Sequence, residues 1–342
     1  MATKTRGTMV ISLDFELSWG RFDTIPIKVL DAESLRTRTH IKRLLALLDK
    51  YEIPTTWATV GHLMLDGCAR DRNGQAHSDV SPHACYSWFP ADWYSFDPCT
   101  NASSAPGWYA PEVLEWIGGT RVRHEIGCHS FGHIVYGDPE CTPAVARADL
   151  KAAVEAAAQK RIILSSFVFP RNLVGHLELL RVSGITAFRG VNPYEVGPGL
   201  GLFLKPLNFL KQLLGCSVKP VQPGEVLPGL WNIPANHFFM ARAGIRKILP
   251  RDGQAIKAMR SIDRATKSGG LYHMWFHPFN LNTDTDAMFY GLEQVFAHAH
   301  RLREAGFLDI FTMGEYAQRL ANQKSCAMPR QRTCHLSPVA SL

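Results

Sequence analysis

Short apolar segments alternate with amphipathic helical segments along most of this 342-residue chain, and this alternation limits the folds available to it. Residues 8–15 hold a nearly continuous apolar run, which is typical of a parallel strand that is covered on both faces. Residues 34–51 repeat apolar side chains at helical spacing, and a second apolar strand follows at residues 55–60. This order predicts a right-handed crossover unit of a parallel sheet.

The same alternation continues almost to the end of the chain. We predict further strands at residues 124–128, 162–169, 185–188, 231–234, 270–276 and 309–312. We predict further helices at residues 111–117, 143–161, 173–182, 251–267, 285–303 and 313–322. The expected α/β fold is a single deformed (β/α) barrel of about seven parallel strands, spanning residues 8–320.

Three segments fall outside this pattern. Residues 65–108 form a loop insertion rich in aromatic residues, which could build a wall of a carbohydrate groove or simply pack into a small core of their own. Residues 196–224 are basic and amphipathic, which fits either contact with a membrane surface or an ordinary outer helix. Residues 321–342 show no period, and we expect a disordered basic tail.

Composition excludes several classes of protein. The net charge is +7, but the basic residues are not clustered, which argues against nucleic acid as a partner. The first residues lack the apolar core of a signal peptide, and no apolar run is long enough to span a bilayer. We therefore expect a cytoplasmic protein, membrane-associated only if residues 196–224 bind lipid. The eight cysteines form no C-x-x-C pair, so no zinc knuckle or redox motif is indicated.

Side chains suited to metal binding follow several of the predicted strands. Asp14 and Glu16 end the first strand, and their spacing places both on one face. His129 and His133 follow the third strand, four positions apart, as on one side of a helical turn. His277 ends a later strand. Each feature alone has an ordinary structural explanation, but the carboxyl ends of barrel strands meet at one edge, where active sites lie.

Imidazole and carboxylate ligands suit zinc, and also iron, cobalt, nickel or manganese. With His129 and His133 as ligands, one of Asp14 and Glu16 would complete the site and the other would remain free as a base. The residues themselves do not decide between the two acids. We expect one divalent metal ion, with zinc favoured.

Three runs of sequence resemble the motifs of the polysaccharide deacetylase family, also called the NodB-homology or carbohydrate esterase family 4 group. They are Ser12-Leu13-Asp14-Phe15-Glu16, His124-Glu125-Ile126-Gly127-Cys128-His129-Ser130-Phe131-Gly132-His133 and Trp275-Phe276-His277-Pro278. The middle run matches the family pattern H-E-I-G-x-H-[ST]-x-x-H. The first run is similar to the variant branch of the family that has Asp-x-Glu in place of adjacent aspartates.

The resemblance implies a metal-dependent hydrolase that removes an N-acetyl group from a sugar of a polysaccharide or glycan precursor, which could be lipid-linked. It implies that Asp14 is the general base and that Glu16, His129 and His133 bind the metal. It further implies that Arg171 pairs with Asp14 and that His277 is the general acid.

We also expect three side chains near these motifs to contact the substrate, namely Trp19, Asn172 and Trp275. Core packing is an equal alternative for Trp19. Two other functions remain open: a deformylase or small-amide hydrolase that uses the same metal site, and a carbohydrate-binding protein without turnover. The oligomeric state is not indicated.

Overall fold

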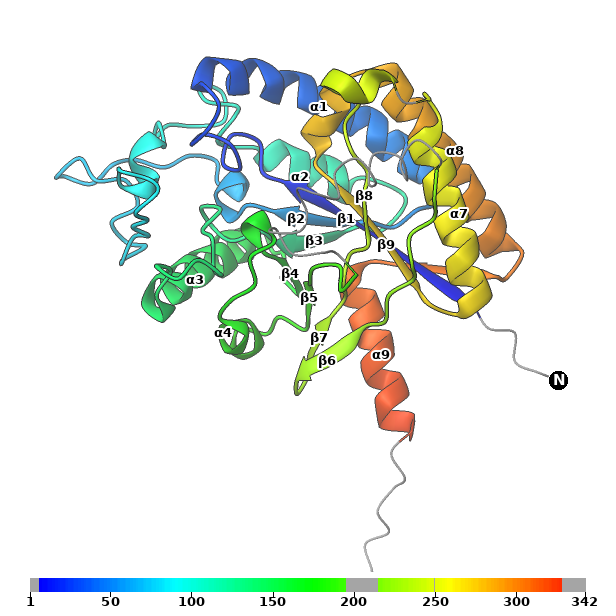
Figure 1. The fold of residues 1–342 in the computed structure, drawn as a ribbon. Helices are drawn as coiled ribbons and strands as arrows, with labels where there is room; N and C mark the ends of the chain where they lie inside the picture. The colour runs from blue at the N-terminus through cyan, green and yellow to red at the C-terminus, as the bar shows by residue number, and fades with distance from the viewer. Residues whose placement is uncertain (1–5, 195–214, 249, 328–342) are drawn as a thin grey trace, which may run out of the picture.

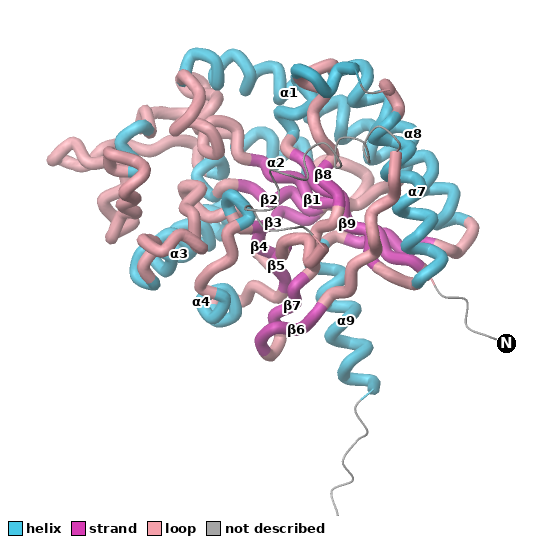
Figure 2. Tube along the Cα trace, in the orientation of Figure 1, coloured by secondary structure: helices cyan, strands magenta, loops and turns pink. Residues whose placement is uncertain are grey.

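The computed structural model describes residues 6–194, 215–248 and 250–327. Its helices lie around the outside of a curled sheet, and irregular loops extend from one side (Figures 1 and 2). The strands are β1 (Gly7–Phe15), β2 (Thr56–Thr59), β3 (Glu125–Cys128), β4 (Ser166–Val168), β5 (Ala187–Arg189), β6 (Gly224–Leu227), β7 (Leu230–Asn232), β8 (His237–Phe238), β9 (Leu271–Phe276) and β10 (Leu308–Phe311). The helices are α1 (Ile27–Tyr51), α2 (Pro111–Gly118), α3 (Pro143–Gln159), α4 (Leu177–Val182), α7 (Gly253–Ser268), α8 (Thr285–Glu304) and α9 (Met313–Ala327).

The sheet has the strand order β6-β7-β5-β4-β3-β2-β1-β9-β8, and β10 also pairs with β1. Every pairing is parallel except that between β6 and β7. All nine residues of β1 are buried, which explains its continuous apolar run. The predicted deformed (β/α) barrel is confirmed, as an open curled sheet.

Helix formation follows the apolar spacing seen in the sequence. In α1 the side chains of Ile41, Leu44, Leu45 and Leu48 are buried against the sheet. At the start of α3 the Thr142 side chain accepts a hydrogen bond from the Val145 N–H, which caps the helix.

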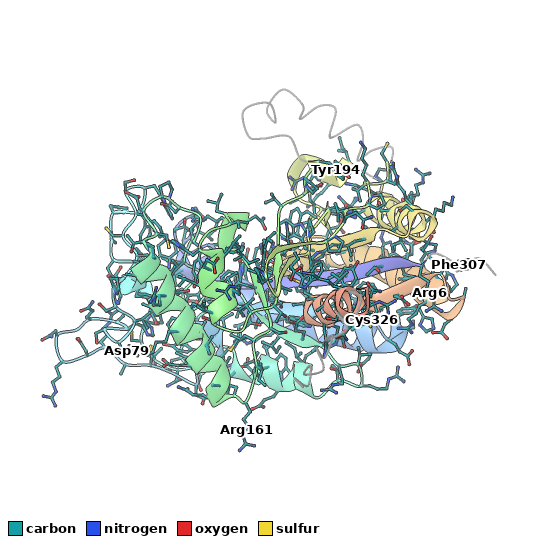
Figure 3. The ribbon with its side chains drawn as sticks, turned by 90° about the horizontal axis from the view of Figure 1, so that it is seen from below. Arg6, Asp79, Arg161, Tyr194, Phe307 and Cys326 are labelled. Atoms are coloured by element: carbon teal, nitrogen blue, oxygen red, sulfur yellow. The ribbon has the colours of Figure 1, made fainter. Side chains whose placement is uncertain are left out.

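The insertion at residues 65–108 contains little regular structure apart from two short 3-10 turns nearby, Gly61–Met64 and Trp93–Phe96. Most of its aromatic residues are buried, including Trp93 and Trp108 at 1% exposure, whereas Trp88 is 40% exposed. The insertion therefore packs mainly around a small aromatic core of its own. In Figure 3 its residue Asp79 lies at the opposite end of the molecule from Phe307.

Several expected boundaries differ from the structure. α1 begins at Ile27, before residue 34, because a turn after β1 leads directly into it. β6 and β8 were not expected, since strands this short carry too few residues to show a period. α9 continues to Ala327, so the first residues of the expected tail are helical.

Residues 328–342, the rest of that tail, lie outside the described residues, as does most of the basic segment 196–224. Among the described residues, no helix is both long and apolar enough to cross a membrane.

Candidate active site

Glu16, His129 and His133 converge at the carboxyl end of the sheet. Glu16 Oε2 lies 3.3 Å from His129 Nε2 and 3.1 Å from His133 Nε2. A tetrahedral ion with bonds of about 2.0–2.1 Å holds its ligand atoms about 3.3 Å apart. All three side chains are at most 4% exposed. The two distances from Glu16 Oε2 thus match the ligand spacing of a tetrahedral metal site, and all three ligand atoms lie within 4.8 Å of one another.

The hydrogen bonding of His129 supports this reading. Its Nδ1 lies 2.7 Å from the carbonyl oxygen of Val168, which can only accept, so Nδ1 carries the proton. In the neutral ring Nε2 then carries a lone pair, and this lone pair faces the Glu16 carboxylate. His129 Nε2 and Glu16 Oε2 are both electron-rich, so they repel each other unless a cation lies between them. A backbone carbonyl that accepts from the other ring nitrogen, as that of Val168 does, is usual for metal-bound histidine. The residues present therefore fit a divalent metal ion.

We expected the two histidines to lie on one side of a helical turn, but the structure places them elsewhere. They belong to a loop in which Ser130 and His133 have positive φ values of 65° and 59°. The buried carboxylate of Asp149 holds this loop by accepting hydrogen bonds from the N–H groups of Phe131 and Gly132. Sequence spacing suggested a helix because its i, i+4 geometry is the common way to pair two side chains, whereas this loop does so through strained backbone.

Gly20 makes room for Glu16. A Cβ atom at position 20 would lie 2.0–2.5 Å from the Glu16 carboxyl atoms, which is far inside contact distance. A larger residue at this position would therefore displace the Glu16 carboxylate.

Asp14 is held by Arg189, the last residue of β5. The guanidinium binds both carboxylate oxygens, at 2.5 and 2.7 Å, and both side chains are almost fully buried. Burial by itself raises the pKa of Asp14, but Arg189 outweighs this effect and lowers that pKa below its usual value. Asp14 is therefore ionised at neutral pH.

Arg189 is itself oriented by a buried relay. Its Nη1 donates to Ser12 Oγ at 3.1 Å, and Ser12 Oγ lies 2.9 Å from His273 Nε2. His273 Nδ1 lies 3.1 Å from the carbonyl oxygen of Ile233, so Nε2 accepts the Ser12 proton. Burial lowers the pKa of His273 to about 3, which keeps the ring neutral in this role.

His277 faces both acids without bonding to either. Its Nε2 lies 3.8 Å from Asp14 Oδ2 and 3.6 Å from Glu16 Oε1. The ring stacks on Phe279, with centroids 4.7 Å apart. Burial raises the pKa of Glu16, but His277 and His133 outweigh this effect and lower that pKa well below its usual value.

Solved structures of known proteins share this architecture. A "putative polysaccharide deacetylase" from Mycobacterium smegmatis superimposes with a TM-score of 0.62 and 14% identity, covering 99% of this chain and 97% of that one. The chain therefore has a NodB-like fold. No protein-family model and no curated protein matches the sequence.

Two carbohydrate-active enzymes are similar to this deacetylase fold to a lesser degree. A 4-alpha-glucanotransferase from Thermococcus litoralis has a TM-score of 0.51 at 10% identity, covering 92% of this chain and 40% of that one. A GH57-type branching enzyme from Pyrococcus horikoshii has a TM-score of 0.50 at 10% identity, covering 91% of this chain and 70% of that one. At these identities the likeness concerns the fold alone.

The expected pairing of Arg171 with Asp14 is wrong. Arg171 instead forms an ion pair with Asp23, and its guanidinium lies 4.4 Å from the ring centroid of Trp88. Arg189 takes the place beside Asp14. The sequence did contain a signal, since Arg189 ends a strand just as Asp14 does, but we expected that strand to stop at residue 188.

The three expected substrate contacts also have other partners. Trp19 is 1% exposed and packs against Trp108, so it belongs to the core of the insertion and cannot flank a sugar. Asn172 Oδ1 accepts a hydrogen bond from Arg189, and Trp275 lies under the Arg189 guanidinium at 4.3 Å. Asn172 and Trp275 thus help to position Arg189.

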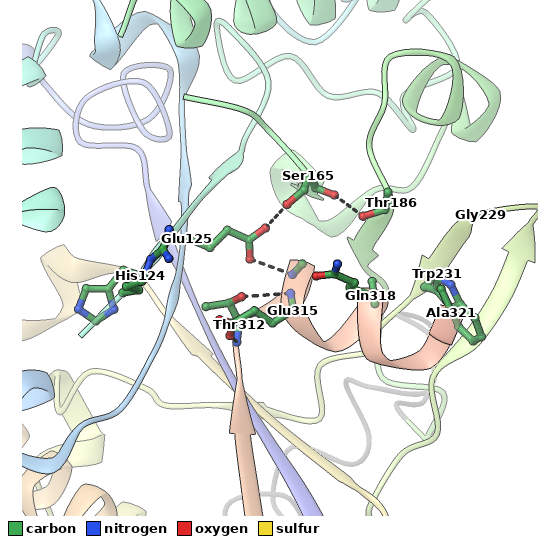
Figure 4. Close-up of a pocket in the computed structure, with 13 residues that line it drawn as sticks. His124, Glu125, Ser165, Thr186, Gly229, Trp231, Thr312, Glu315, Gln318 and Ala321 are labelled. Carbon is green, nitrogen blue, oxygen red and sulfur yellow. Dashed lines mark hydrogen bonds between the residues drawn. The ribbon is translucent and has the colours of Figure 1, made fainter. Parts of the chain in front are cut away.

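A pocket of about 730 Å³ lies elsewhere, near the starts of β3, β4 and β5 and the first turn of α9 (Figure 4). There Glu125, from the middle motif, accepts hydrogen bonds from Ser165 Oγ, Thr56 Oγ1 and the Gly314 N–H. Glu125 therefore ties α9 to the sheet, at the end opposite the candidate active site.

Proposed function

We propose that the protein is a metal-dependent hydrolase that removes an N-acetyl group from a sugar of a polysaccharide or glycan precursor. The observation that carries this proposal is the convergence of Glu16, His129 and His133 beside an ionised Asp14 and a histidine that faces both acids. Zinc suits the two imidazoles and the carboxylate.

Each residue has a distinct part in this proposal. Glu16, His129 and His133 would hold the metal, and when bound a divalent cation acidifies water and polarises an amide carbonyl. Asp14 takes the proton from the attacking water, and Arg189 keeps Asp14 ionised and oriented for this. His277 donates a proton to the leaving nitrogen, so that acetate and a free amino sugar are released.

The electrostatics argue against glycosyl transfer, despite the fold shared with a glucanotransferase and a branching enzyme. Cleavage of a glycosidic bond by two carboxyl groups needs one of them to stay protonated and act as an acid, with a raised pKa. Here the pKa values of both Asp14 and Glu16 are lowered. Neither acid at the end of β1 is suited to that role.

Trp88 is the candidate sugar contact in place of Trp19. It is 40% exposed, and it stacks on Tyr86 with ring centroids 4.8 Å apart. The Arg171 guanidinium covers part of its ring, so Arg171 and Trp88 together would form one rim of the site.

Replacement of the base tests the proposed division of labour. We expect Asp14→Asn to fold and to bind metal as the wild type does, because Asp14 is not among the three ligands. Its rate of acetate release from N-acetylated saccharides should fall by about 10²–10⁴-fold, the usual contribution of a general base. Full activity in this variant would show that Asp14 is not the base.

A further inference from the structure

A second cluster of potential metal ligands lies at the base of the insertion, among residues that the proposed reaction does not use. It consists of His62, Cys68, His77 and Asp97, each of which offers one ligand atom within 4.8 Å of the others. His62 and Asp97 are at most 1% exposed and His77 is 7% exposed. We propose that these four residues form a structural zinc site that fastens the insertion to the barrel.

The distances from Cys68 Sγ to the other three ligand atoms are close to those of a tetrahedral site. Cys68 Sγ lies 3.8 Å from His62 Nε2, 3.7 Å from His77 Nε2 and 3.4 Å from Asp97 Oδ2. With zinc–sulfur and zinc–nitrogen bonds of about 2.3 and 2.0–2.1 Å, such atoms lie about 3.6 Å apart. Asp97 Oδ2 is nearer to the two imidazoles, at 2.8 and 2.6 Å, and would move outward by roughly half an ångström to bind.

The surrounding hydrogen bonds orient these atoms toward one centre. His62 Nδ1 lies 3.0 Å from the carbonyl oxygen of Trp108, so Nδ1 carries a proton and Nε2 points at Asp97. Asp97 Oδ1 accepts hydrogen bonds from the Cys99 N–H and the Tyr109 hydroxyl, which leaves Oδ2 facing inward. Backbone and hydroxyl partners of this kind fix the ligands of metal sites.

Three potential donors, two imidazoles and a thiol, thus converge on one carboxylate oxygen. His62 Nδ1 already donates to the Trp108 carbonyl, so Nε2, which lies 2.8 Å from Asp97 Oδ2, is the nitrogen placed to bind a cation. With zinc, both rings are neutral, Cys68 is a thiolate, and all four ligands serve one cation. A mixed sulfur and imidazole set favours zinc over calcium or magnesium.

The place of the cluster in the fold explains what the ion would stabilise. His62 follows β2, whereas Cys68, His77 and Asp97 are spread along an insertion with little regular structure. A bound metal stabilises such a segment because its binding free energy adds to that of folding. A pocket of about 280 Å³ reaches Cys68 and His77 and offers a path for the ion.

The cluster also contacts the loop of residues 129–133, which carries His129 and His133. The Phe131 ring packs against both His62 and His77, with centroids 5.6 and 5.3 Å apart. The His62 N–H donates to the Phe131 carbonyl oxygen at 2.9 Å. Zinc at this cluster would therefore brace the loop that positions His129 and His133.

Cobalt substitution distinguishes this site from the candidate active site, because only the second cluster contains a cysteine. We expect the cobalt-loaded full-length protein to show the near-ultraviolet charge-transfer band of a cobalt–thiolate bond. Cys68→Ser should lose the band. Cys85→Ser is the matched control, since Cys85 is exposed in the same insertion and lies outside the cluster, and it should keep the band.

Metal content gives a second readout that does not depend on the folding of the Cys68 variant. The purified wild type should hold two zinc ions per chain, and the double variant Glu16→Gln/His133→Gln should retain one. A folded wild type with no cobalt–thiolate band, or a band that persists in Cys68→Ser, would overturn the proposal. Loss of acetate release with the band intact would instead count against the proposed function alone.

Discussion

At the scale of single residues, the site depends on pairs in which one group sets the protonation state or tautomer of another. Arg189 holds Asp14 ionised, and the Val168 carbonyl fixes the tautomer of His129. The sequence placed Asp14, Glu16, His129 and His277 at strand ends, because that follows from the order of elements. It could not give their partners, because a pairing such as Arg189 with Asp14 depends on which strands become close across the curved sheet.

The pairing of Arg189 with Asp14 predicts a change in the pH dependence of activity. Arg189→Lys keeps the charge but loses the bidentate contact, while burial continues to raise the pKa of Asp14. The acidic limb of the pH–rate profile should therefore move to higher pH, by on the order of one unit. Arg171→Lys is the control and should leave that limb in place, since Arg171 pairs with Asp23. Identical limbs in both variants would contradict the assignment.

The neutral His273 predicts a pH dependence of stability. Its pKa is lowered to about 3 in the folded protein, against about 6.5 when unfolded. Between these values the unfolded chain binds one more proton, so this residue's contribution is complete above pH 6.5 and is lost progressively as the pH falls toward 3.

His273→Gln should make the free energy of unfolding fall less steeply across that window, by about 1.4 kcal/mol per pH unit. Urea titrations of both proteins at several pH values measure the two slopes. Equal slopes would mean that His273 is not held neutral.

At the scale of elements, the turn after β1 and the loop after β3 shape the site through unusual backbone. Gly20 leaves space for the Glu16 carboxylate, and Asp149 of α3 holds the loop of residues 129–133. Sequence spacing identified the two histidines but assigned them to a helical turn. Positive φ at Ser130 and His133 has no periodic signature, so only the structure reveals this loop.

Gly20→Ala should displace Glu16 and remove the metal without unfolding the protein. The added Cβ would overlap the Glu16 carboxyl group, and the side chain must rotate away from the two histidines. We expect the rate of acetate release to fall by at least about 100-fold, because mutations that displace a metal ligand reduce activity on this scale.

Gly118→Ala is the matched control for this variant. A Cβ atom at position 118 meets nothing within 4 Å, so metal content and activity should be unchanged. Wild-type metal content in Gly20→Ala would show that the close approach does not matter.

At the scale of the whole molecule, the sequence predicted the barrel well because each strand–helix unit has its own period. It predicted little about residues 65–108, where no period exists. His62, Cys68, His77 and Asp97 all lie within residues 62–97 but match no short motif, so only the folded insertion brings their ligand atoms together. The same folding buried Trp19, for which the sequence had left substrate contact and core packing equally open.

The central claim is that this fold carries a metal-dependent deacetylase site. Its most direct test is acetate release from a panel of N-acetylated saccharides, measured on protein of known metal content before and after chelation. We expect release by the metal-loaded protein, loss on chelation and recovery when zinc is restored. A folded, metal-loaded protein that releases no acetate from any of these saccharides, or release that is unaffected by complete removal of metal, would contradict the account.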